Sequence, residues 1–190
     1  MKLRSLIIAM ALLIISLAVA TAQTFITNGL VAYYPFNGNA NDASGNGNNP
    51  NNIQATLCAD RFGIANSAYT FNGINNFIGF ASVPMNQVDN WTMTAWVKPA
   101  STNQDQTIAV ALGFDNGNTG NGYSLGIYLG QLRAVFGGVG DIIGGFAFLS
   151  TNQWYQVIMS RKSGTTSFYV NGMVAPGSTT ATPQTPTAFT

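Results

Sequence analysis

Glycine and asparagine interrupt this chain so often that no stretch after residue 22 sustains a helical period. Between the interruptions, apolar residues alternate with mostly polar ones. Trp91, Met93 and Ala95, for example, occupy every second position of one such segment. Because side chains of a β-strand point to alternate faces, this period of two is typical of a half-buried strand. The pattern therefore restricts the chain to an all-β fold.

Short strands of this kind recur along the chain, with turn residues between them. Strands are expected over residues 30–36, 68–71, 77–80, 91–98, 108–114, 123–129, 132–136, 153–161 and 166–170, and one more begins at Met173. Tight turns are expected at Gly130-Gln131, Ser163-Gly164 and Asn171-Gly172, the last as a type I′ turn. Residues 37–52 hold eight asparagines and predict a long loop. Many short strands at near-regular spacing indicate a sandwich or a barrel.

Aromatic side chains are numerous enough to fill the space between two sheets. Most of the following residues are therefore expected in the core: Tyr33, Tyr34, Phe36, Phe71, Trp91, Trp96 and Trp154. Cys58, the only cysteine, is also expected to be buried, since only Arg61 lies near enough in sequence to activate a thiolate.

The first 22 residues have the features of a signal peptide. Lys2 and Arg4 precede an apolar run over residues 6–19, and small residues at 20–22 form a cleavage site. The run is shorter than the roughly 20 residues of a spanning helix. We therefore expect a secreted or cell-surface protein with no membrane span after cleavage. Residues 23–176 are expected to form one domain, and residues 177–190 a tail rich in threonine and proline or the start of a continuation.

The composition argues against catalysis and against nucleic-acid binding. The chain has no histidine and no glutamate, although these residues carry much of acid-base catalysis. Without Lys2 and Arg4, five basic residues stand against six aspartates, so no basic patch exists to attract a phosphate backbone. Gly122-Tyr123-Ser124-Leu125-Gly126 matches the nucleophile elbow of hydrolases, but Ser124 is expected in a strand and no histidine could take its proton.

Six segments together carry a family resemblance, in the order 29–36, 39–47, 68–73, 91–99, 154–157 and 168–172. In these segments the chain resembles the laminin-G-like domains of the concanavalin A-like lectin/glucanase superfamily, in the secreted bacterial form. The resemblance implies an antiparallel jelly-roll sandwich of two sheets, usually one module of a larger multidomain protein. Related domains continue with further strands after the position of Pro186, so C-terminal strands are expected to be missing here. The alternative is a natural short form that ends in a tail.

The asparagine-rich loop is the candidate metal site. Asp42 and Asn46 offer side-chain oxygens beside glycines that let backbone carbonyls converge, and calcium prefers such oxygen ligands. The resemblance also implies a calcium ion near this loop. The alternative is an Asx-turn, in which Asp42 accepts hydrogen bonds from the amides of Ser44 and Gly45.

Two further features suit carbohydrate. One polar loop carries amides and is followed by an aromatic residue, and its candidate ligand-binding residues are Asp115, Asn116, Asn118, Asn121 and Tyr123. Trp96 lies on the opposite face of its strand from the apolar stripe and could support a sugar ring. The alternatives are a solvated loop and a packed tryptophan.

The leading hypothesis is a secreted, non-catalytic module that binds a glycan or a cell-surface protein, with or without calcium. One alternative is a fragment of a glycoside hydrolase on the same fold. Retaining glycosidases use two carboxyl groups about 5 Å apart, whereas the nearest acids in this sequence are Asp105 and Asp115. Another alternative is a structural or adhesive spacer within a larger protein.

Overall fold

The computed structural model describes residues 27–81, 89–103, 105–111, 122–137, 139–143 and 149–182. The chain forms two units, residues 1–30 and residues 31–190. The described part of the first unit is a turn, in which the amide of Leu30 donates to the carbonyl of Thr27 at 3.1 Å. The predicted signal peptide lies outside the described residues.

The second unit is built from strands, and its described residues contain no helix. The strands are β1 (Asn52–Ile53), β2 (Thr56–Cys58), β3 (Ala68–Thr70), β4 (Ile78–Gly79), β5 (Trp91–Val97), β6 (Gln106–Ala111), β7 (Tyr123–Tyr128), β8 (Gln131–Phe136), β9 (Gly140–Ile143), β10 (Tyr155–Lys162), β11 (Thr165–Val170) and β12 (Met173–Thr179). The prediction of an all-β chain is confirmed.

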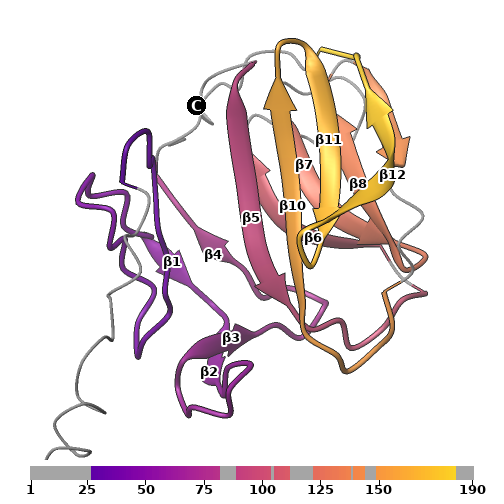
Figure 1. Cartoon of the computed structure of the whole chain (residues 1–190). Coiled ribbons are helices and arrows are strands. Elements are labelled where there is room, and N and C mark those ends of the chain that lie inside the picture. The colour runs from indigo at the N-terminus through magenta and orange to yellow at the C-terminus, as the bar shows by residue number, and fades with distance from the viewer. Residues whose placement is uncertain are drawn as a thin grey trace, which may run out of the picture. The chain divides into compact units, whose positions relative to one another are not determined.

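Two antiparallel sheets of four strands form the body of this unit (Figure 1). The front sheet has the order β12-β11-β10-β5, and the back sheet has the order β6-β7-β8-β9. The strand pairs β1–β4 and β2–β3 form two small sheets of their own. This arrangement is the two-sheet sandwich that the sequence predicts.

A single hydrophobic core joins the front and back sheets. Strands β5, β10 and β11 contribute alternate side chains from the front, and β7 and β8 contribute them from the back. At one point the ring of Trp91 stacks on the ring of Tyr123 from the facing sheet, with centroids 4.2 Å apart and planes 2° apart. Burial of these alternate positions fixes the register of each strand, because a slip by one residue would turn its apolar set toward water.

Three of the connections are two-residue hairpins whose central residues have positive φ. In Asn171-Gly172 the φ angles are 51° and 78°, and Ser163-Gly164 and Leu129-Gly130 have the same signs. A type I′ turn requires positive φ at both central residues, and its twist matches the twist of the two strands that it joins. The predicted turns at 163–164 and 171–172 are confirmed, and the turn predicted at 130–131 lies one residue earlier.

A bulge in β6 explains why a glycine occupies the middle of β7. The pairing of β6 with β7 shifts between Thr107 and Ala109, and the backbone of β6 comes close to Gly126 there. A Cβ atom at Gly126 would lie 2.5 Å from the carbonyl oxygen of Gln106. Only glycine permits this approach of the two backbones.

The strand expected over residues 30–36 is absent. The Tyr33 amide donates to the carboxylate of Asp42, and the Val31 carbonyl accepts from the side chains of Asn46 and Asn48. The side chains of the loop thus form hydrogen bonds with backbone groups that would otherwise pair with a neighbouring strand, and no strand forms here.

Most of the aromatic residues expected in the core lie outside it, which corrects that prediction. Trp91 is buried, whereas Tyr33, Phe71 and Trp96 are exposed. Tyr34 and Phe36 are half-buried and pack against Phe80 and Tyr69 in a smaller cluster of their own, with centroids 5.1 Å apart in both pairs. Cys58 is likewise half-buried rather than buried, and it forms no disulfide.

Candidate functional site

The outer face of the front sheet collects side chains that the core does not use. On β5, β10 and β11 the alternation of buried and accessible residues sends every second side chain outward. The outward residues of these three strands are Thr92, Thr94, Trp96, Gln156, Ile158, Ser160, Lys162, Thr165, Ser167 and Tyr169. We refer to this set as the outer face. Hydroxyl and amide groups dominate it, with two aromatic rings among them.

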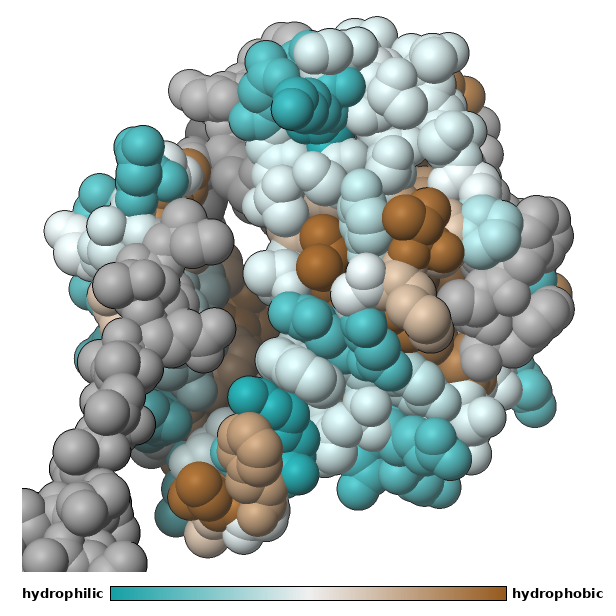
Figure 2. All heavy atoms as spheres, viewed as in Figure 1, coloured by the Kyte–Doolittle hydropathy of each residue, from teal (hydrophilic) through white to brown (hydrophobic). Residues whose placement is uncertain are grey.

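Cross-strand pairing groups these side chains into rows. Trp96 pairs with Gln156, Ile158 with Tyr169, and Ser160 with Ser167. In the view of Figure 2 this sheet faces the reader, and its surface is largely pale to teal with separate brown groups. The face is therefore a polar surface with isolated apolar points rather than an apolar patch that needs a covering helix.

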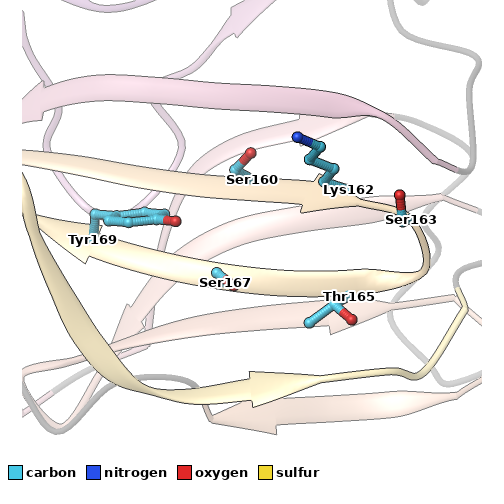
Figure 3. Close-up of a pocket in the computed structure, with 6 residues that line it drawn as sticks. All are labelled: Ser160, Lys162, Ser163, Thr165, Ser167 and Tyr169. Carbon is cyan, nitrogen blue, oxygen red and sulfur yellow. The ribbon is translucent and has the colours of Figure 1, made fainter.

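A shallow hollow lies on the outer face where β10 turns into β11. Six residues line it: Ser160, Lys162, Ser163, Thr165, Ser167 and Tyr169. Figure 3 shows them spaced along the two strands and their turn, with the Tyr169 ring at one end and the lysine near the other. Four hydroxyl-bearing residues, one phenol and one ammonium can donate or accept hydrogen bonds here.

The charge of the outer face is positive. Lys162 is exposed on β10, and Lys98 is exposed directly after β5, two positions beyond Trp96. None of the ten outer-face residues is acidic. A ligand that lies across this face therefore meets cations and hydroxyl groups but no carboxylate of the face itself.

Trp96 points outward, as the period of its strand predicts, and 43% of its surface is exposed. The alternative of a fully packed tryptophan is therefore wrong for this residue. The guanidinium carbon of Arg61 lies 4.3 Å from the Trp96 ring centroid and 4.2 Å from that of Phe62. Both distances are within the range of a cation–π contact. The sequence reasoning missed Arg61 because it is 35 positions from Trp96 and belongs to a loop without periodicity.

Asp42 organises the asparagine-rich loop through four hydrogen bonds. One carboxylate oxygen accepts from the amides of Tyr33 and Ser44, and the other accepts from the Ser44 hydroxyl and the Asn48 amide, all at 2.8 to 2.9 Å. Partial burial acts to raise the pKa of Asp42, but these hydrogen bonds outweigh it and lower the pKa from 3.8 to about 2. Burial and the nearby Asp42 charge raise the pKa of Tyr34 to about 12.

This geometry favours the Asx-turn over a calcium site. A carboxylate has about four lone-pair positions, and four donors already occupy those of Asp42. Asn46 directs its amide nitrogen, rather than its oxygen, at the Val31 carbonyl. The donor set in this arrangement does not fit calcium, which would have to replace these hydrogen bonds. The Ser44 amide takes part in the turn as expected.

The second predicted sugar site is only partly described. Asp115, Asn116, Asn118 and Asn121 lie outside the described residues. Tyr123 has no exposed surface, stacks on Trp91 in the core, and its pKa is raised by burial. The expectation that its ring presents a face to a sugar is therefore corrected: the strand alternation of β7 turns Tyr123 inward.

The remaining aspartates with described side chains also have structural partners. Asp60 accepts from the amides of Phe62 and Ile64, Asp89 accepts from the amide of Gly164 and lies 3.6 Å from Arg161, and Asp105 pairs with Arg133. Within the described part of the chain, no three residues among histidine, cysteine, aspartate and glutamate form a group that could hold a metal ion. Ser124 lies in β7, so the nucleophile-elbow pattern lacks its strand-to-helix turn.

The two packed antiparallel sheets place the chain in the class of β-sandwich domains, an architecture that many extracellular domains share. A family model described as the concanavalin A-like lectin/glucanases superfamily matches residues 72–190, which is more than half of the chain. The chain belongs to this superfamily. The matched region contains β4 to β12 and the whole outer face, whereas Asp42 and Arg61 precede it.

Comparison with curated proteins gave no match, and comparison with solved structures gave none either. The described residues include no helix of the length and apolar character that crossing a membrane would require. At the coarse level, membership of the superfamily supports a domain that binds carbohydrate or a protein partner.

Proposed function

We propose that this chain is a secreted, non-catalytic recognition module and that its outer face binds carbohydrate. The observation that carries the proposal is the outer face itself, which places hydroxyl groups, a glutamine, a tyrosine and a tryptophan on one accessible sheet surface. Sugar rings offer many hydroxyl groups for hydrogen bonds and an apolar side for an aromatic ring. The predicted signal peptide supports action outside the cell.

Two features support a binding role over hydrolysis. The sequence has no glutamate and no histidine. In addition, Asp42, Asp60, Asp89 and Asp105 each have the structural partners described above. A glycosidase needs a pair of carboxyl groups on either side of the scissile bond. Nothing in the described geometry favours such a pair.

Affinity electrophoresis of the purified chain through gels that contain single soluble polysaccharides tests this proposal. We expect retardation by at least one polysaccharide and a loss of about tenfold in affinity for Trp96→Ala and for Tyr169→Ala, because each variant removes an aromatic contact. Tyr128→Ala removes an exposed aromatic ring from the back sheet and serves as the matched control.

Three results would count against the proposal. Free migration in every gel would contradict carbohydrate binding and favour the structural or adhesive spacer. Retention by extracellular matrix proteins alone would assign the face to a protein partner. Release of reducing ends from any polysaccharide by the purified chain would contradict the non-catalytic assignment. Each gel is run with calcium and with a chelator, so that any dependence on calcium is seen directly.

A further inference from the structure

We propose that Arg61, in contact with the rings of Phe62 and Trp96, binds a carboxylate, and that the ligand of the outer face is an acidic polysaccharide with uronic acid residues. This inference rests on the function proposed above and names its ligand class.

Arg61 contacts two aromatic rings. Its guanidinium carbon lies 4.2 Å from the Phe62 centroid and 4.3 Å from the Trp96 centroid. A guanidinium has five N–H donors, and a cation–π contact with a ring uses none of them as a conventional hydrogen bond, so donors stay available to a ligand. These donors match the two oxygens of a carboxylate, and the contacts with the two rings reduce the conformational entropy that a freely mobile arginine would lose on binding.

The turn that carries Arg61 is held in place independently of any ligand. Asp60 accepts hydrogen bonds from the amides of Phe62 and Ile64 at 2.9 Å, and Gly63 takes a positive φ of 80° between them. The carboxylate nearest to Arg61 in sequence is therefore engaged by the backbone of the turn. Its role here is to fix the loop from which Arg61 and Phe62 project.

No described residue neutralises Arg61. Three arginine side chains are described, and two of them pair with aspartates: Arg133 with Asp105, and Arg161 with Asp89. Arg61 has neither an ion pair nor a side-chain hydrogen bond to any described residue, and it is exposed. This exposed guanidinium is therefore available to pair with an external anion.

Trp96 connects Arg61 to the outer face. The tryptophan is an outer-face residue, with exposed Lys98 two positions further along and Gln156 paired beside it. A polysaccharide that lies across this part of the face has its sugar rings beside hydroxyl and amide side chains of the protein. Near Trp96 it also meets two cations, Arg61 and Lys98. This combination suits a sugar chain with carboxylates better than a neutral one, because both cations gain a partner.

Isothermal titration of the full chain with polygalacturonate, with its methyl ester and with neutral dextran tests the inference. We expect polygalacturonate to bind at least tenfold more tightly than its methyl ester, and more weakly as salt rises. Arg61→Gln should lower the affinity for polygalacturonate about tenfold, a change equivalent to about 1.4 kcal/mol, and should leave affinity for the neutral polymer unchanged. Arg61→Lys should not restore it, because an ammonium cannot form the planar pair.

Arg133→Gln is the control, because it removes the same charge from the back sheet, away from the outer face. The urea midpoint of each variant is measured first, so that a folding defect is not counted as a binding defect. Equal binding of acidic and neutral polymers, with no effect of Arg61→Gln, would overturn this inference and leave carbohydrate binding intact. Failure of every polymer to bind would overturn the proposed function as well.

Two further probes decide the source of the anion. Tighter binding of dextran sulfate than of polygalacturonate would assign Arg61 to sulfate and contradict the carboxylate. Binding of polyglutamate as tight as that of polygalacturonate would show that the sugar backbone contributes nothing, and would move the assignment to an acidic protein.

Discussion

Asp42 links the stability of the asparagine-rich loop to pH. Its pKa in the folded protein is about 2, below the ordinary value of 3.8, so folding favours the ionised form. The resulting stabilisation is present above about pH 4 and is lost as the pH falls toward 2. An asparagine at this position has one acceptor oxygen instead of two and carries no charge to titrate.

We therefore expect Asp42→Asn to lower the urea midpoint at pH 6 and to have progressively less effect between pH 4 and pH 2. The measurement is urea unfolding of both proteins at several pH values in this window. A difference that stays constant down to pH 2 would contradict the assigned hydrogen bonds. If the Asx-turn is correct, the urea midpoint at pH 6 is the same with calcium as with a chelator. A higher urea midpoint with calcium would support the metal site predicted from the sequence.

Arg161 is a buried cation whose partners come from several parts of the fold. Its guanidinium nitrogens donate to the Thr166 hydroxyl, the Ala181 carbonyl and the Thr182 hydroxyl at 2.7 to 3.1 Å, and Asp89 lies 3.6 Å away. Removal of a buried ionic partner leaves polar groups without hydrogen bonds. We expect Arg161→Ala to lower the free energy of unfolding by about 3 kcal/mol.

Arg161→Lys separates the charge from the geometry of the guanidinium. Lysine keeps the charge but cannot reach all three oxygens with a planar fork, so a loss of about 2 kcal/mol is expected. Chemical denaturation of both variants measures the two losses. A lysine variant as stable as the parent would show that charge alone accounts for the role of Arg161.

Side-chain direction could be predicted from the sequence wherever a strand was long enough to show its period. The outward position of Trp96 and the inward position of Met93 follow from one alternating segment. Arg61 could not be found in this way, because its contact with Trp96 joins a loop to a distant strand. Tyr123 fits two patterns in the sequence, because it follows a polar loop and is also the first residue of β7, where it shares the inward face with Leu125 and Ile127.

At the scale of elements, the hairpin between β11 and β12 depends on one asparagine. Asn171 has a φ of 51°, and its side-chain oxygen accepts from the amide of Gln156 on β10 at 2.9 Å. We expect Asn171→Ala to cost about 2 kcal/mol, because it combines a strained left-handed backbone with a lost hydrogen bond.

Asn171→Gly is the matched variant, since glycine tolerates positive φ and lacks only the side-chain acceptor. It should cost about 1 kcal/mol. Urea unfolding of the two variants compares them under one condition. Equal losses would show that the backbone conformation contributes little and that the hydrogen bond to Gln156 dominates.

The long strands and their turns could be predicted, and so could the short strands β3 and β4, whereas β1 and β2 could not. Strands β5, β7, β8, β10 and β11 each span at least six residues, enough to show alternation, and glycine follows an αL residue in their hairpins. Strands β1 and β2 have two and three residues, too few for any period. The strand expected over residues 30–36 failed for a different reason, because the loop side chains that bond its backbone are up to 17 positions away.

In the molecule as a whole, the front and back sheets share one core, to which no residue of 31–80 contributes. The two large sheets should therefore unfold together. The near-ultraviolet circular dichroism, which reports the Trp91–Tyr123 stack, should follow the same urea curve as the far-ultraviolet signal of the strands. Separate midpoints for the two signals would contradict a shared core.

Hydrogen exchange tests whether residues 31–80 are separate from the core that the two large sheets share. Amides of β7, β8 and β10 should exchange most slowly, and the amides that bond to Asp42 should exchange at least tenfold faster, because opening the loop exposes little apolar surface. Equal protection of the two regions would show that residues 31–80 are integrated into the main cooperative unit.

The pairing of β12 bears on self-association. Within the described residues β12 is an end strand of the front sheet, and three features interrupt its regularity: Pro176, which lacks an amide hydrogen, Gly177 with a φ of 110°, and the shift of register opposite Ser167 and Phe168. A strand of another molecule that approached this edge would find a broken row of donors and acceptors. This edge is therefore a poor template for fibril growth by addition of strands along β12.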